Sequence, residues 1–129
     1  MKKILLLLLL MTACTQTYTI NIYKDMGSSG ADRFYNVTLT FKDDELIKGN
    51  SRYDYWSGSD GSHTISKCKY INNNWEKIGN STTCSVSIVT DNQTTNIPDT
   101  RANIQKYIQT GQYKPAKTCK TGEICYKVL

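Results

Sequence analysis

Apolar and polar residues alternate over most of this chain, and most regularly within residues 35–41. Tyr35, Val37, Leu39 and Phe41 occupy every second position, with asparagine or threonine between them. Successive side chains of a β-strand point to opposite faces, so this pattern is typical of a strand with one buried and one solvated face. The chain is therefore expected to fold around a β-sheet.

Shorter stretches of the same kind predict the rest of this sheet. The linkers between them are too short for crossover helices, so the strands are expected to be antiparallel. Residues 42–45 are polar and predict a tight turn between two strands of a hairpin, the second of which Gly49 is expected to bulge or bend. The other strands are expected within residues 18–22, 46–56, 65–71, 83–90 and 125–128.

One helix is predicted in the C-terminal part. Pro98, Asp99 and Thr100 form a typical helix start, in which Asp99 can cap the first turn, and Gly111 is expected to end the helix. A single amphipathic helix beside several strands is best buried against one face of the sheet. The expected fold class is α+β, with an antiparallel sheet of about five or six strands and one C-terminal helix packed on it. The apolar positions of the predicted helix are Ala102, Ile104, Tyr107 and Ile108.

Four cysteines, Cys68, Cys84, Cys119 and Cys125, suit a small domain stapled by disulfides in an oxidising compartment. They allow three connectivities. A turn at residues 121–122 would set Cys119 opposite Cys125, which favours that pair and leaves Cys68 to join Cys84. The Cys-x-x-Cys spacing is missing, so a redox site or a zinc ribbon is the weaker interpretation.

The Cys68–Cys84 pair restricts the segment between these cysteines. Two tight turns, at residues 72–74 and 79–81, would set the cysteines on either side of a central strand, beyond the roughly 7 Å Cα separation that a disulfide spans. Residues 72–82 are therefore expected to form one broad, irregular connection. Cys68 and Cys84 would then lie on neighbouring strands, with Trp75 or Ile78 folded over the disulfide.

The N-terminus has the composition of an export signal. Lys2 and Lys3 precede an apolar run at residues 4–11, much shorter than the roughly 20 residues that cross a bilayer as a helix. Residues 11–14, Met-Thr-Ala-Cys, resemble the lipobox of prokaryotic lipoproteins, with methionine where leucine is usual. The resemblance implies cleavage before Cys14 and lipidation of that cysteine. The alternative is an ordinary secretory signal that happens to end before a cysteine.

This resemblance, which covers the first fourteen residues only, implies a place for the protein in the cell. It would be exported and held by lipid on Cys14 at the extracytoplasmic side of a membrane, in the cell envelope. Residues 1–13 would be the cleaved signal peptide, 14–17 the lipidated cysteine and a short tether, and 18–129 a single α+β domain. So short a tether would keep the domain close to the bilayer.

The charged residues favour neither catalysis nor nucleic-acid binding. The 16 basic side chains outnumber the 11 acidic ones, but they are scattered along the chain instead of clustered. His63 is the only histidine, and neither it nor Asp54 and Glu76 belong to a motif of catalytic spacing. A turn explains the acidic residues 43–45 better than a calcium loop does. We expect a non-catalytic protein without a cofactor or metal.

The best functional lead is the segment from Arg52 to His63, in which aromatic residues adjoin a Ser/Gly-rich loop. Rigid amphipathic rings beside small flexible residues are common in recognition surfaces. The candidate binding residues are Tyr53, Tyr55, Trp56 and His63. The competing interpretation, which the ordinary use of aromatics in strands favours, is that one alternating set fills the core.

Together these features predict a small envelope lipoprotein that acts as a non-catalytic binding or accessory subunit. Its partners would be the membrane, through Cys14, and an envelope protein or a glycan, with no nucleic acid. An anchored binder of glycans or an inhibitor of an external enzyme is the alternative, and a hydrolase is a remote one.

Overall fold

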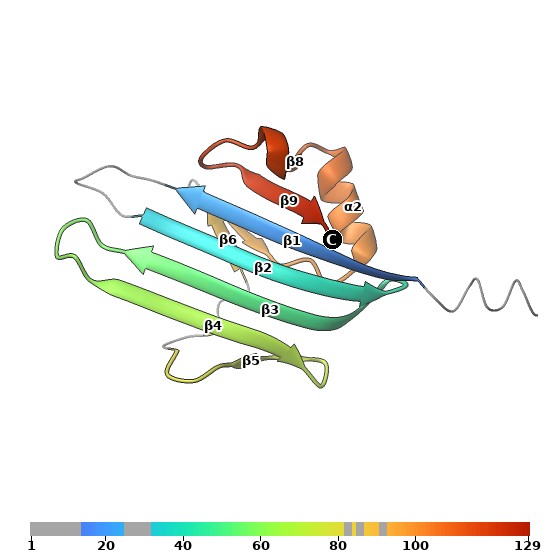
Figure 1. Cartoon of the computed structure of the whole chain (residues 1–129), viewed down its shortest axis with the longest axis horizontal. Coiled ribbons are helices and arrows are strands. Elements are labelled where there is room, and N and C mark those ends of the chain that lie inside the picture. Colours follow the sequence, from blue (N-terminus) through green and yellow to red (C-terminus); the bar gives the residue numbers. More distant parts are fainter. Residues whose placement is uncertain (1–13, 25–31, 82–83, 85–86, 91–92) are drawn as a thin grey trace, which may run out of the picture.

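A seven-stranded sheet dominates the computed structural model, which describes residues 14–24, 32–81, 84, 87–90 and 93–129. Its strands are β1 (Thr15–Lys24), β2 (Asp32–Lys42), β3 (Glu45–Trp56), β4 (His63–Ile71), β5 (Asn74–Lys77), β8 (Tyr113–Pro115) and β9 (Ile124–Val128). They are ordered β5-β4-β3-β2-β1-β9-β8 across the sheet (Figure 1). Neighbouring strands are antiparallel except β8 and β9, which are parallel.

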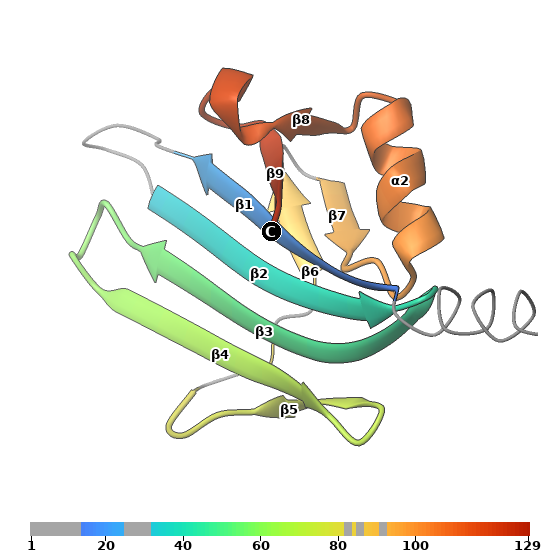
Figure 2. The same cartoon turned by 45° about the vertical axis from the view of Figure 1, so that its right-hand side comes forward.

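A two-stranded sheet and the α-helix lie on one side of the main sheet (Figure 2). β6 (Ser87–Thr90) pairs with β7 (Gln93–Asn96), and α2 (Arg101–Gln109) follows them. Ile88, Ile97 and Ile104 are buried in the same cluster as the apolar residues of β1 and β2. The surface of the main sheet that carries this cluster is its inner face, and the opposite surface is its outer face.

The inner face carries the alternating apolar residues that the sequence predicted to be buried. The four alternating apolar residues of β2 are at most 2% exposed, as is Ile20 of β1. Between them, polar side chains point outward and bond to one another across the strands: Thr17 and Thr40 join their hydroxyls at 3.0 Å, and Asn36 donates to Asn21. Burial of each large apolar side chain stabilises the fold by about 2 kcal/mol.

The sheet is larger than the five or six strands predicted, and the fold is sheet-dominated instead of a clear α+β fold. The sheet is also mixed, because β8 and β9 are parallel with Tyr113 opposite Ile124. Parallel neighbours usually need a crossover of about a dozen residues or more. Here residues 116–123 make the crossing, folded compactly by the 3-10 helix η1 (Ala116–Thr118) and by the Cys119–Cys125 disulfide, whose Cα atoms are 5.8 Å apart. The prediction of a purely antiparallel sheet was therefore wrong.

The helix lies where the sequence predicted it, but its N-terminus is held differently. Thr100, and not Asp99, is the N-cap, and its hydroxyl accepts a hydrogen bond from the backbone N–H of Asn103. A carboxylate oxygen of Asp44 accepts a second bond, from the N–H of Ala102, at 2.7 Å. The acidic turn between β2 and β3 therefore also fastens α2. Of the predicted apolar positions Ile104 is buried and Ala102 is exposed.

The expected irregularity in β3 lies at Ile47 instead of Gly49. The pairing of β2 with β3 shifts at residues 40–41, which leaves Ile47 as the extra residue. Gly49 has another role, because a Cβ there would lie 2.7 Å from the indole of Trp75 and 3.2 Å from Tyr70 Cβ. The absence of a side chain at Gly49 allows Trp75 of β5 to lie across β3.

Gly49→Ala is expected to lower the free energy of unfolding by about 1 kcal/mol, because the added methyl must displace the indole. Without that contact an alanine in a strand would be neutral or slightly stabilising. Urea unfolding of Gly49→Ala in the wild type and in a Trp75→Leu background checks this, and the loss should be clearly smaller in the second, where only the close approach to Tyr70 Cβ remains. An equal loss in both backgrounds would contradict the role given to Gly49.

Both turns between Cys68 and Cys84 are tight, so the broad connection expected for residues 72–82 was wrong. Asn72 and Asn73, with φ values of 52° and 60°, join β4 to β5 as a hairpin. A second turn follows at residues 79–80, where Gly79 has a φ of 59°. Asparagine and glycine are the residues that adopt such positive φ values most readily.

The Cys68–Cys84 disulfide nevertheless forms, with Cα atoms 5.5 Å apart. Both strand neighbours of Cys68 are already occupied, by Ser51 of β3 and Lys77 of β5. Cys68 is fully buried, so Cys84 approaches it from the inner face and does not lie on a neighbouring strand. Of the two residues expected over the disulfide, Trp75 packs against Tyr70, with ring centroids 5.4 Å apart, and Ile78 is exposed. Of the strand expected at residues 83–90, the structure shows β6, which pairs with β7 and not with the main sheet.

Candidate binding surface

Three large aromatic side chains are exposed together on the outer face of the sheet. Tyr23 is 44%, Phe34 36% and Trp56 48% exposed. Tyr23 pairs with Phe34 across β1 and β2, and Asp32 pairs with Trp56 across β2 and β3. We call the end of the sheet that carries these residues the aromatic end. Elsewhere on the outer faces of β1 and β2 the positions are polar, mostly threonine and asparagine, so this cluster interrupts a polar surface.

His63 extends the aromatic end onto β4. Its ring stacks on the indole of Trp56, with centroids 3.6 Å apart and an angle of 12° between the planes. Its Nε2 lies 2.8 Å from Oδ1 of Asp54. The stack and the hydrogen bond fix the ring orientation of His63 and thereby support the indole from one side.

Asp54 is buried although it lies on the outer face. Its residue exposure is 6%, and Arg52 donates two hydrogen bonds to its carboxylate, from Nε at 2.6 Å and from Nη2 at 3.1 Å. The Arg52 bonds, with a further contribution from His63, hold the pKa of Asp54 below its ordinary value against the opposing effect of burial. A charge-assisted network of this kind makes the support beneath Trp56 rigid.

This network predicts how stability depends on pH. Because the pKa of Asp54 is lower in the folded state, its ionised form stabilises the fold above the unfolded pKa of about 3.9, and the contribution is lost as the pH falls below that value. Asp54→Asn is expected to lower the free energy of unfolding at pH 7 by about 1–2 kcal/mol and to reduce its decrease between pH 7 and pH 3. Urea unfolding at both pH values measures this. An unchanged pH dependence would contradict it.

The four candidate binding residues are divided between the two faces. Trp56 and His63 point outward, whereas Tyr53 and Tyr55 belong to the inner set. The ring of Tyr53 packs on that of Tyr35, with centroids 6.4 Å apart, and the guanidinium carbon of Arg33 lies 5.6 Å from the ring centroid of Tyr55. Tyr53 is therefore part of the packing around the core, as the competing interpretation of this segment expected.

Two adjoining hollows make the aromatic end concave. The first, of about 210 Å³, is lined by Tyr23, Asp32, Arg33, Phe34 and Trp56. The second, of about 320 Å³, extends from the same Tyr23 and Phe34 to the loop before β9; its lining includes Asn21, Cys119, Lys120 and Thr121. The two hollows share Tyr23 and Phe34, so they lie side by side across β3, β2 and β1, and together we call them the aromatic groove.

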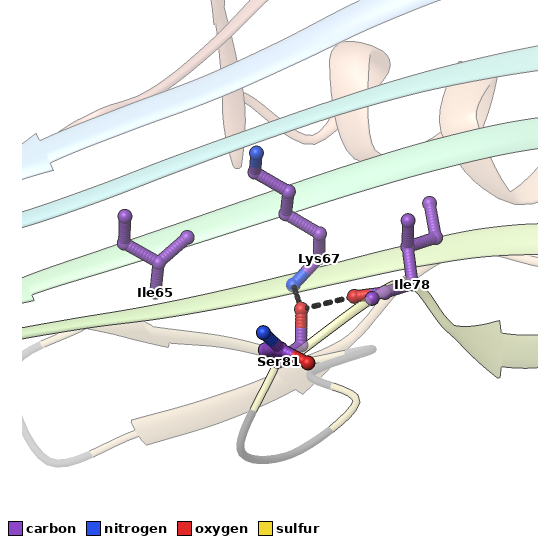
Figure 3. Close-up of a pocket in the computed structure, with 6 residues that line it drawn as sticks. Ile65, Lys67, Ile78 and Ser81 are labelled. Carbon is purple, nitrogen blue, oxygen red and sulfur yellow. Dashed lines mark hydrogen bonds between the residues drawn. The ribbon is translucent and has the colours of Figure 1, made fainter.

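A separate cavity of about 320 Å³ lies at the edge of β4, beside Ile65 and Ile78 (Figure 3). The hydroxyl of Ser81 accepts a hydrogen bond from the N–H of Lys67 at 2.9 Å and donates one to the carbonyl of Ile78 at 2.7 Å. Ser81 thus satisfies the backbone of β4 beyond the end of its pairing with β5. This arrangement is structural, because it closes a strand edge.

Cys14 lies at the end of the sheet opposite to the aromatic end. Its carbonyl accepts a hydrogen bond from the N–H of Asp43 at 2.8 Å, and Nη1 of Arg101 lies 3.0 Å from its sulfur. β1 begins directly after it, so the residues 15–17 expected as a tether belong to the strand and pair with residues 40–42. The 10 residues of β1 span about 30 Å between the two ends.

Comparison with known proteins adds no further information about this surface. No protein family, curated protein or solved structure matches the chain significantly. Among the residues that the structure describes, no helix is long and apolar enough to cross a membrane, and no group of three or more His, Cys, Asp or Glu side chains could hold a metal ion.

Sequence reasoning found Trp56 and His63 but missed most of the aromatic groove. Tyr23 and Phe34 were overlooked because each lies just outside a predicted strand, at residues 18–22 and 35–41. Their positions carried a signal, since each is a large aromatic residue in the set that is otherwise polar, mostly Thr and Asn. The groove itself depends on strand pairing that brings residues far apart in sequence together.

Proposed function

We propose that this protein is a lipid-anchored, non-catalytic binding protein of the cell envelope that presents its aromatic end to a partner. The observation that carries the proposal is the placement of Cys14 and the exposed aromatic residues at opposite ends of the sheet. Lipid on Cys14 would hold that end at the bilayer, because β1 begins at the next residue. The aromatic end would then stand about 30 Å further out.

Exposure of the aromatic residues supports binding as their role. Monomeric proteins rarely leave a cluster of large apolar side chains in water unless it meets a ligand or partner. Tyr and Trp give large contact areas at a small cost in conformational entropy. The polar residues beneath Trp56 have a structural role, because the carboxylate of Asp54 already accepts hydrogen bonds from Arg52 and His63. Binding is therefore favoured over hydrolysis as the use of this end.

The anchor is tested first by mass spectrometry of the mature protein. We expect an N-terminal peptide that begins at Cys14 and carries a diacylglyceryl group. A mature N-terminus elsewhere, or an unmodified Cys14, would contradict the anchored role.

The orientation is tested with the mature lipidated protein in liposomes whose lipids carry a nitroxide quencher on the headgroup. In a Trp75→Phe variant the fluorescence of Trp56 should be quenched little, because Trp56 is far from the bilayer. The matched control is Ile47→Trp in a chain with both native tryptophans changed to Phe, since Ile47 is as exposed as Trp56 but lies towards the Cys14 end. Its fluorescence should be strongly quenched. Stronger quenching of Trp56 than of the control would contradict the proposal.

A further inference from the structure

We infer that the aromatic groove is a binding site for an oligosaccharide chain, which deepens the proposed function and rests on it. The ligand class follows from the lining of the groove. Aromatic rings from three adjacent strands lie beside groups that can donate or accept hydrogen bonds, among them Asp32, Lys120 and Thr121. A sugar ring has matching chemistry, because its C–H face packs on an aromatic ring while its hydroxyls bond to polar groups at the rim.

The shape of the groove favours a chain over a single ring. The hollows of about 210 and 320 Å³ meet at Tyr23 and Phe34. Neighbouring strands are about 4.8 Å apart, so Trp56 on β3 and Tyr23 on β1 are separated by about 10 Å across the sheet. The second hollow continues beyond β1 to Lys120 and Thr121. This length accommodates consecutive sugar units that contact different aromatic residues.

The rigidity of the groove agrees with this ligand. Trp56 is backed by His63, which is held by Asp54, so the indole is oriented before a ligand arrives. At the other side, the N–H of Gly122 donates to the carbonyl of Tyr23 at 2.8 Å, and the Cys119–Cys125 disulfide closes the same loop. A preorganised surface loses little entropy when it binds a weakly hydrophobic, hydroxyl-rich chain.

Other ligand classes fit the groove less well. A single-stranded nucleic acid needs a continuous basic track, whereas Arg33 and Lys120 line different hollows and the acidic Asp32 lies beside Arg33. A peptide that adds a strand needs an open sheet edge, but the groove lies on the face of β1, β2 and β3, each of which has a strand on both sides in the sheet. A lipid surface is excluded by the proposed anchor at the opposite end.

The test uses the mature lipidated protein in liposomes, because sugar-headed detergents would compete for the groove. Isothermal titration is carried out with four defined probes: chitotetraose, cellotetraose, maltotetraose and mannotetraose. At least one is expected to bind, and Trp56→Ala and Phe34→Ala should each weaken that binding about tenfold, the effect of losing one ring contact. Ile47→Ala, an equally exposed apolar residue outside the groove, should leave the affinity unchanged.

Unfolding measurements check that the variants are folded, and because these side chains are partly exposed their midpoints should fall only modestly. Two outcomes would overturn the inference. One is that none of the four oligosaccharides binds; the other is binding that is insensitive to both groove variants. In either case the quenching experiment still decides the proposed function separately, since it reports the orientation of the aromatic end and not its ligand.

Discussion

Replacement of both Cys68 and Cys84 by alanine is expected to lower the free energy of unfolding by about 3 kcal/mol and the melting temperature by roughly 10–15 °C. The sequence separation of 16 residues sets the size of the effect, because the crosslink restricts a loop of that length in the unfolded chain. Cys68 is fully buried at a point where both neighbouring strands are already paired. The disulfide therefore helps to fix the chain after β5 onto the inner face, together with the buried Ile88 and Ile97. Urea and thermal unfolding under non-reducing conditions measure the loss.

The second disulfide supplies a matched control. The pair Cys119–Cys125 has a sequence separation of only 6, so its replacement by alanine should cost about 2 kcal/mol. It should also disturb the loop that lines the far part of the aromatic groove, whereas loss of Cys68–Cys84 should not. If the shorter bridge proved the more stabilising, the role assigned to Cys68–Cys84 would be wrong.

Leu39→Ala is expected to lower the free energy of unfolding by about 3 kcal/mol or more. Leu39 is fully buried on β2, in the middle of the core that joins the main sheet to β6 and α2. Its truncation loses apolar burial and leaves a cavity that neighbouring strands cannot close without moving. Chemical denaturation of the purified mature protein provides the measurement.

The control for this prediction lies one residue away. Thr38 points to the outer face of the same strand, so Thr38→Ala should change the free energy of unfolding by less than about 0.5 kcal/mol. Similar losses for Thr38→Ala and Leu39→Ala would show that the assignment of the two faces is wrong.

The alternation was sufficient to predict β2 and its buried face. Every second residue of a strand points to the same face, so the apolar set of β2 identifies the face that is buried. The helix was predictable for a similar reason, since its start signals and Ile104 agree. The sequence also favoured the two cysteine pairs that the structure contains. Each of these features depends on residues close together in the chain or on a simple pattern.

Features that depend on tertiary arrangement were not predictable. The inference about residues 72–82 assumed that Cys84 must stay in the plane of the sheet, whereas Cys84 bonds to the buried Cys68 from the inner face. The parallel pairing of β8 and β9 was not expected, because parallel strands are seldom joined by a connection as short as residues 116–123. The aromatic groove required the register of β1, β2 and β3, which places Tyr23 beside Phe34 and Asp32 beside Trp56.

The central claim, that one end of the sheet is anchored and the other end binds, is tested most directly by photo-crosslinking in the native cells. A benzophenone amino acid is placed at Phe34 in one variant and at Ile47 in a second. Both positions are exposed, but the first lies in the aromatic groove and the second towards the Cys14 end. The account predicts a discrete adduct from Phe34 and none of the same kind from Ile47. Adducts of equal yield from both positions, or from Ile47 alone, would contradict it.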